Sequence, residues 1–139
     1  MKHDNGVELC PRCEVFLGEA HPVMVEWYRG VKKAYPQAHI SCAWRGKEDQ
    51  ERAVLEGKSR AHWPDSKHNK VYPSGAPAAE ALDLFRLSPD GRAHWPPLWF
   101  ADIAEWSEDE PILWGGRFKA FRDTPHFELS LAKSEGAPS

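Results

Sequence analysis

The sequence predicts an α+β domain in which a small antiparallel sheet is flanked by helices. Apolar residues recur at helical spacing between Pro22 and Pro36, as they do in a helix that packs on one face. Apolar and polar residues alternate from His126 to Leu131, which is typical of a half-buried strand. An apolar run surrounds Asp83, and its length favours a buried strand.

The 139 residues are expected to form one domain with its own hydrophobic core. We assign residues 1–132 to this domain, with residues 1–20 as an N-terminal extension that carries a Cys-x-x-Cys pair. Residues 133–139 are rich in small and polar types and are expected to form a disordered tail.

Charge and hydropathy argue against several classes of protein. The formal net charge is -3, which gives no electrostatic footprint for nucleic acid. The N-terminus is polar and lacks the apolar segment of a signal peptide, and no apolar run reaches membrane-spanning length. We therefore expect no nucleic-acid partner, no membrane partner and a protein that is cytoplasmic when synthesised.

The first half of the chain is expected to form a helix, a strand and a second helix. Pro22 suits the first turn of the first helix, and Pro36 ends it. Residues 39–44 follow as a strand that delivers Arg45. Residues 47–56 form a short polar helix, which a glycine stops.

The second half is expected to alternate loops with short elements. Residues 59–77 are mostly loop, and the strand around Asp83 follows. The composition of residues 88–91 predicts a turn, and residues 97–106 form a helix that begins with a proline. The last strand starts at His126, with apolar side chains on one face and polar side chains on the other.

The loop before the last strand holds a candidate catalytic pair. Asp123 lies three residues before His126 in the segment Asp-Thr-Pro-His. A catalytic zinc takes three protein ligands and keeps a fourth position for water, whose proton must pass to a nearby carboxylate. Asp123 can supply this base and His126 one ligand, although a pattern of four residues also arises by chance.

Two upstream residues can complete such a site. His68 supplies a second imidazole, and Asp83 lies in an apolar run, where a carboxylate is costly to bury unless a cation pairs with it. The residues alone leave a second interpretation open, in which Asp83 faces outward on an edge strand and His68 lies in a polar turn.

These segments follow one another in a recognisable order: Ala43-Trp44-Arg45 with Gln50 downstream, Ser66-Lys-His68, Ala81-Leu-Asp83, Trp114-Gly-Gly, and Asp123-Thr-Pro-His126-Phe-Glu-Leu. In this order they resemble the M15 zinc peptidases, which have the Hedgehog/DD-peptidase-like fold of the D-Ala-D-Ala carboxypeptidases. The closest likeness is to the L-alanyl-D-glutamate peptidase branch found in phage endolysins. The resemblance covers roughly residues 20–131.

The resemblance implies a role for each of five residues. His68, Asp83 and His126 are expected to bind Zn²⁺, and Asp123 is expected to be the general base. Arg45 would then steady the scissile carbonyl or the oxyanion.

The resemblance also implies the substrate, a peptidoglycan stem peptide cut at an L-Ala-D-Glu or D-Ala-D-Ala type of bond. Ser66 and Trp114 are the expected substrate contacts. A phage or prophage endolysin of this kind would reach the wall after holin-type release or from a virion, so virion components are further expected partners. The alternative is a non-catalytic phage structural or cell-wall-binding protein that retains the fold and the zinc.

The chain departs from the family between His68 and Asp83, where fourteen residues replace a much shorter spacing. Such an insertion is tolerated if the two ligands still meet at its base. Glu80 is an alternative ligand, but we prefer Asp83 because the apolar strand around it fixes its backbone.

The cysteines are expected to be free thiols, with a second metal site and a disulfide as the alternatives. Cys10 and Cys13 have the spacing of a zinc knuckle or a redox pair, and Cys42 with His3 or His21 would complete four ligands. A redox or zinc-finger protein built on this pair explains none of the Asp-Thr-Pro-His region. The remaining histidines are expected to be exposed or structurally satisfied: His3, His21, His39, His62 and His94.

Overall fold

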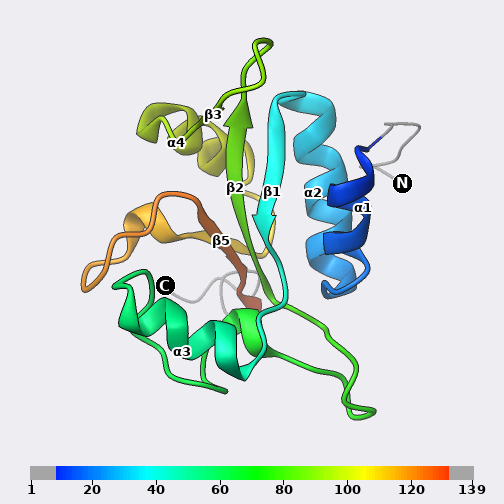
Figure 1. Cartoon of the computed structure of the whole chain (residues 1–139). Coiled ribbons are helices and arrows are strands. Elements are labelled where there is room, and N and C mark those ends of the chain that lie inside the picture. The colour runs from blue at the N-terminus through cyan, green and yellow to red at the C-terminus, as the bar shows by residue number, and fades with distance from the viewer. Residues whose placement is uncertain (1–8, 132–139) are drawn as a thin grey trace.

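The computed structural model describes residues 9–131, which form an α+β domain around an antiparallel five-stranded sheet (Figure 1). The order along the sheet is β1-β2-β5-β4, and β3 pairs with β2. The strands are β1 (Ala38–Cys42), β2 (Ala81–Leu87), β3 (Ala93–His94), β4 (Ile112–Trp114) and β5 (His126–Leu129). This architecture confirms the predicted fold class, whereas the predicted tail 133–139 lies outside the described residues.

Three of the four α-helices of the described residues were expected from the sequence. The four helices are α1 (Pro11–Leu17), α2 (Pro22–Ala34), α3 (Lys47–Leu55) and α4 (Pro97–Trp106), with 3-10 turns η1 (Lys67–Asn69) and η2 (Gly115–Arg117). Three of the four α-helices begin with a proline, whose fixed φ and missing N–H suit the first turn. Over residues 9–131, no helix has both the length and the apolar character needed to cross a membrane.

The core lies on the face of the sheet that bears Phe127. This side chain is fully buried, and its ring lies 5.0 Å from that of Trp27 in α2 and 6.4 Å from that of Phe100 in α4, measured between centroids. Burial of an aromatic ring of this kind contributes roughly 1.5–3 kcal/mol to stability. Because side chains alternate along a strand, the neighbouring His126 points to the opposite face, and Asp83 in β2 faces it there.

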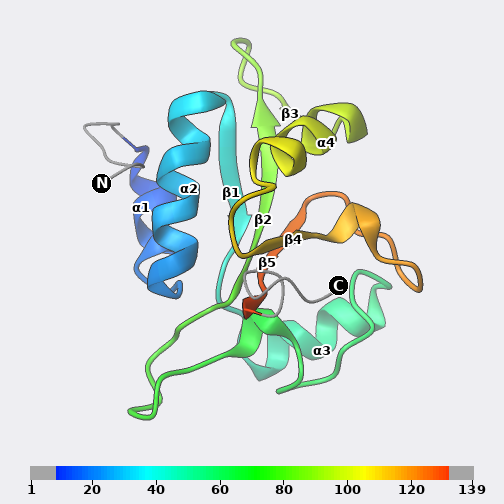
Figure 2. The same ribbon diagram turned by 180° about the vertical axis from the view of Figure 1, so that it is seen from behind.

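Helix α1, which lies in the segment 1–20 that the sequence analysis treated as the domain's N-terminal extension, packs against the core. It lies beside α2 in both views (Figures 1 and 2), and Leu9, Cys13 and Leu17 belong to the buried core. The backbone N–H of Ile40 in the edge strand β1 donates to Cys13 Sγ at 3.5 Å. Helix α1 therefore covers an edge that would otherwise expose unpaired backbone groups.

The segment between η1 and β2 forms a hairpin, which projects from the domain at the bottom of Figures 1 and 2. Val71 and Pro77 form an antiparallel bridge, and the Ala78 N–H donates to the Lys70 carbonyl at 2.9 Å. Since the hairpin closes on itself, its two ends leave the fold side by side, and the insertion after η1 does not separate η1 from β2.

Shortening this hairpin is expected to leave the fold intact. If residues 72–76 are replaced by Asn-Gly, the bridge between Val71 and Pro77 remains, and a two-residue turn suits the twist of the paired strands. Halving a loop changes the closure free energy by only about 0.6 kcal/mol, so the free energy of unfolding in urea should change by less than about 1 kcal/mol. Ala79→Asp, at a fully buried position, is the destabilising control, and an equal loss in both variants would contradict the prediction.

Candidate metal centre

A partly buried carboxylate lies between two imidazoles on the face of the sheet opposite the core. Asp83 Oδ1 is 3.3 Å from His68 Nε2 and 3.2 Å from His126 Nδ1. Asp83 and His126 are cross-strand partners in β2 and β5, whereas His68 is delivered by η1. The structure thus brings together all three residues that the sequence analysis selected as metal ligands.

The other nitrogen of each imidazole already has an acceptor. His68 Nδ1 lies 2.7 Å from the Ala43 carbonyl, and His126 Nε2 lies 2.8 Å from Glu128 Oε1. Because a carbonyl or a carboxylate can only accept, each of these nitrogens carries a proton. The remaining nitrogens face Asp83, which is the arrangement of metal-binding histidines whose outer nitrogen is held by an oxygen.

Protons hold this cluster together when no cation does. Burial alone would lower the pKa of His68, but the Asp83 carboxylate raises it to about 10. In the same way, the pKa of His126 rises to about 9 despite its burial. Burial would raise the pKa of Asp83, but the two imidazoles hold it well below its usual range. A metal ion would therefore replace protons, as it does at most histidine sites.

The donor set fits zinc. Ligands about 2.0 Å from a tetrahedral zinc lie about 3.3 Å from one another, and Asp83 Oδ1 is 3.3 and 3.2 Å from the two imidazole nitrogens. Donor atoms within 4.8 Å of one another form two trios that share Asp83, one with Cys42 and His68 and one with Asp123 and His126. His68 and His126 fall in different trios, so the two imidazoles would move towards each other if both bound one ion beside Asp83.

Asp123, the expected general base, lies at the edge of the cluster and has a raised pKa. Its carboxylate lies 4.0 Å from His126 Nδ1, at the edge of the cluster. Burial and the neighbouring charge of Asp83 raise its pKa above the ordinary value for an aspartate. A carboxylate whose pKa rises towards the working pH is a better proton acceptor in catalysis.

Arg45 completes the charge balance of the site. Its Nη2 lies 3.6 Å from Asp83 Oδ2, and its Nη1 donates to Gln50 Oε1 at 2.9 Å. Gln50 is fully buried in α3 and donates in turn to the Ala61 carbonyl at 2.6 Å. The contacts with Asp83 and Gln50 therefore fix the position of the guanidinium at the end of its flexible side chain.

Trp114 and the glycines after it shape the loop that carries Asp123. Trp114 Nε1 donates to the Thr124 carbonyl at 2.7 Å, and its ring stacks on Phe127. The Gly115 carbonyl accepts from the Asp123 N–H at 3.0 Å, and a Cβ at Gly115 would overlap the Asp123 carbonyl. Trp114, predicted to contact substrate, lines neither of the two cavities beside the site, and its visible role is to position this loop.

Ser66, the other predicted substrate contact, caps η1. Its hydroxyl accepts from the His68 N–H at 3.1 Å, and its own N–H donates to Asn69 Oδ1 at 3.0 Å. Ser66 also lines the larger cavity, so its position allows a substrate contact as well as the support of His68.

Two cavities open on the cluster from either side. The larger has a volume of about 770 Å³ and reaches His68, Asp123 and His126. The second, of about 690 Å³, reaches Asp83 and Asp123 from the side of β1. Arg45, Lys58 and Asp123 line both cavities.

Glu80, the alternative ligand, is engaged elsewhere. Its carboxylate lies 3.6 Å from Lys67 Nζ, and its N–H donates to the Lys67 carbonyl at 2.9 Å. These contacts fasten the base of the hairpin. The geometry therefore favours Asp83 over Glu80 as the carboxylate between the imidazoles.

Three partners in this site were not identified from the sequence. Glu128 was assigned only to the polar face of the last strand, yet its position two residues after His126 puts it on the same face and could have indicated the contact. Cys42 and the Ala43 carbonyl approach His68 from β1 and its loop, and no local pattern signals that approach.

Comparison with known proteins identifies the fold. No protein-family model matches this chain, and no curated protein sequence does. Its structure is similar to the crystal structure of the L-Ala D-Glu endopeptidase ChiX from Serratia marcescens, with a TM-score of 0.69 and 24% sequence identity. The match covers 90% of this chain and 91% of that one, so the likeness extends over the whole domain.

Substituting Gly115 is expected to disturb the site through its backbone. In Gly115→Ala the new methyl group would overlap the Asp123 carbonyl, and relief of such a clash typically costs about 1–3 kcal/mol. The free energy of unfolding should fall by that amount in chemical denaturation. Gly46→Ala is the matched control, because its Cβ meets only the Trp44 ring at 3.4 Å; equal losses for the two variants would contradict the prediction.

Proposed function

We propose that this protein is a zinc-dependent peptidase that cleaves peptidoglycan stem peptides. The observation that carries the proposal is the carboxylate of Asp83 between two imidazoles whose outer nitrogens are already bonded. The base Asp123 lies beside them, at the junction of two cavities. The structural similarity to an L-Ala D-Glu endopeptidase supports the same activity.

The residues of the chain divide the chemistry between them. Zn²⁺ held by His68, Asp83 and His126 would lower the pKa of a bound water and polarise a substrate carbonyl. Asp123 removes the proton of the attacking water and returns it to the leaving amine. Arg45 orients the scissile carbonyl and stabilises the negative charge that develops on its oxygen.

The charge of the larger cavity favours an acidic substrate. Six basic side chains line it, against three acidic ones. The basic residues are Arg45, Lys58, Arg60, Lys67, Arg117 and Lys119. A stem peptide that contains D-glutamate presents carboxylates to this surface, so we assign the L-Ala-D-Glu type of bond as the one cleaved.

The biological setting follows from the sequence resemblance. We assign the enzyme to a phage or prophage, as an endolysin that reaches peptidoglycan after holin-type release or from a virion.

Removing the base should separate metal binding from hydrolysis. Asp123→Asn is expected to keep zinc and to lose about 10²- to 10⁴-fold in kcat, the usual contribution of a general base. His126→Ala should lose both zinc and activity, because it removes a ligand. Mass spectrometry of digested peptidoglycan measures the product, and elemental analysis measures the metal.

Asp102→Asn is the matched control, because this side chain is exposed on α4. It should keep wild-type zinc content and activity. Wild-type hydrolysis in Asp123→Asn or in His126→Ala would refute the assigned roles. Chelation should abolish activity and added Zn²⁺ restore it, whereas bound zinc without any cleavage would support a non-catalytic wall-binding protein.

Glu128 is expected to tune the metal through His126. In Glu128→Ala the outer nitrogen of His126 loses its acceptor, and loss of such a partner typically weakens metal binding by about 10- to 100-fold. Glu128→Gln keeps an oxygen acceptor and should recover part of the affinity. A zinc competition titration measures both, with Glu80→Gln as the control, and equal affinities in the three variants would contradict the role of Glu128.

A further inference from the structure

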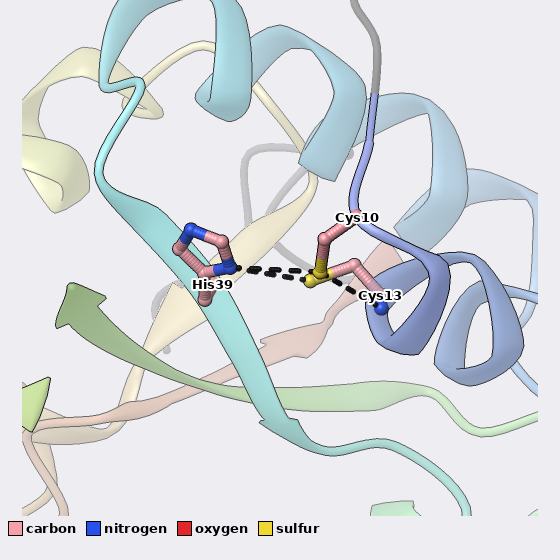
Figure 3. Close-up of side chains that lie close together, drawn as sticks. All are labelled: Cys10, Cys13 and His39. Carbon is pink, nitrogen blue, oxygen red and sulfur yellow. Dashed lines mark hydrogen bonds between the residues drawn. The ribbon is translucent and has the colours of Figure 1, made fainter. Parts of the chain in front are cut away.

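We propose that Cys10, Cys13 and His39 form a second metal site, which binds a thiophilic divalent cation such as Zn²⁺. The two cysteines stand at the start of α1, and His39 points at their sulfur atoms from β1 (Figure 3). His39 Nδ1 lies 3.7 Å from Cys10 Sγ and 3.7 Å from Cys13 Sγ, and the three donor atoms all lie within 4.8 Å of one another. This site shares no residue with the centre at Asp83 and does not rest on the proposed function.

The spacing of the donors matches a tetrahedral ion. With Zn–S about 2.3 Å and Zn–N about 2.0 Å, sulfur and nitrogen ligands of one zinc lie about 3.5 Å apart and two sulfur ligands about 3.8 Å apart. The observed separation of 3.7 Å from nitrogen to each sulfur is close to these values. Little movement is therefore needed to seat an ion between the three side chains.

Both sulfur atoms already accept hydrogen bonds, although burial still raises the pKa of the Cys13 thiol. The Cys13 N–H donates to Cys10 Sγ at 3.4 Å. Cys13 Sγ accepts from the Ile40 N–H at 3.5 Å and from the Tyr28 hydroxyl at 3.6 Å. Donors that surround ligating sulfur in this way orient it and stabilise its negative charge.

His39 is oriented by its surroundings. Its ring stacks on Phe85 at a centroid distance of 5.7 Å, and its Nε2 lies 3.2 Å from Lys32 Nζ. Coordination through Nδ1 moves the imidazole proton to Nε2, so the Lys32 ammonium must turn away. It can do so on its flexible stem, because the Pro36 and Ala38 carbonyls already accept from it.

The ligand set differs from the one considered from the sequence. His21 Nδ1 accepts from the Val23 N–H and so caps α2, and Cys42 lies beside His68. His3 lies outside the described residues. Within residues 9–131 the cluster has three donors, and water completes the tetrahedron.

Cobalt substitution tests the site in the full-length chain. The reduced, metal-free His126→Ala variant, whose first centre lacks a ligand, should take up one Co²⁺ per chain and show a thiolate-to-cobalt charge-transfer band. Cys42→Ser in the same background is the thiol control and should keep the band. Cys10→Ser with Cys13→Ser should abolish it, and His39→Gln should weaken binding by more than the roughly 100-fold that loss of an outer-shell partner costs.

X-ray absorption on the zinc-loaded His126→Ala protein tests the site without altering its cysteines. The spectrum should show two sulfur ligands at about 2.3 Å and nitrogen or oxygen ligands at about 2.0 Å. Three results would overturn the proposal. They are a spectrum without sulfur ligands, a cobalt band that persists without Cys10 and Cys13, and a reduced chain that takes up no metal and only forms a Cys10–Cys13 disulfide on oxidation. None of these results would affect the proposed peptidase activity.

Discussion

The partly buried carboxylate of Asp83 is the constraint on which the rest of the site depends. Its neighbours Leu82 and Leu84 are fully buried, and an unpaired charge in such a strand costs several kcal/mol. Three positively polarised groups offset that cost: His68, His126 and Arg45. They come from η1, from β5 and from the loop after β1, so a single charge requires three distant segments to meet.

Each of these groups is in turn fixed by a neutral or acidic partner. The Ala43 carbonyl orients His68, Glu128 orients His126 and Gln50 orients Arg45. A buried polar network in which every member is satisfied is rigid, because any rotation leaves a group without its partner. Rigidity of this kind holds ligands within the narrow limits that a metal site or a catalytic site demands.

Elements with a long local signal could be predicted from the sequence. Helices α2 and α4 follow from apolar spacing and their first prolines, and β5 follows from its alternation. Helix α1 has seven residues, and β3 and β4 have two and three, which is too short for a period to show. The proposed ligands His68, Asp83 and His126 were recognisable because they stand in motifs of fixed order. The contacts that Cys42 and the Ala43 carbonyl make with His68, from the end of β1 and the loop after it, arise from tertiary pairing, which no local pattern encodes.

Strand β1 contributes residues to both clusters, the one at Cys10 and Cys13 and the one at Asp83. It carries His39 towards α1, and at its other end it carries Cys42 and then Arg45 towards Asp83. Its pairing with β2 shifts register between Ile40 and Cys42, and such an irregularity bends a strand and redirects the side chains that follow. A bent edge strand is stabilised by a contact with another element. Helix α1 supplies this contact, because the Ile40 N–H donates to the sulfur of Cys13. The N-terminal segment therefore anchors the strand that delivers Arg45.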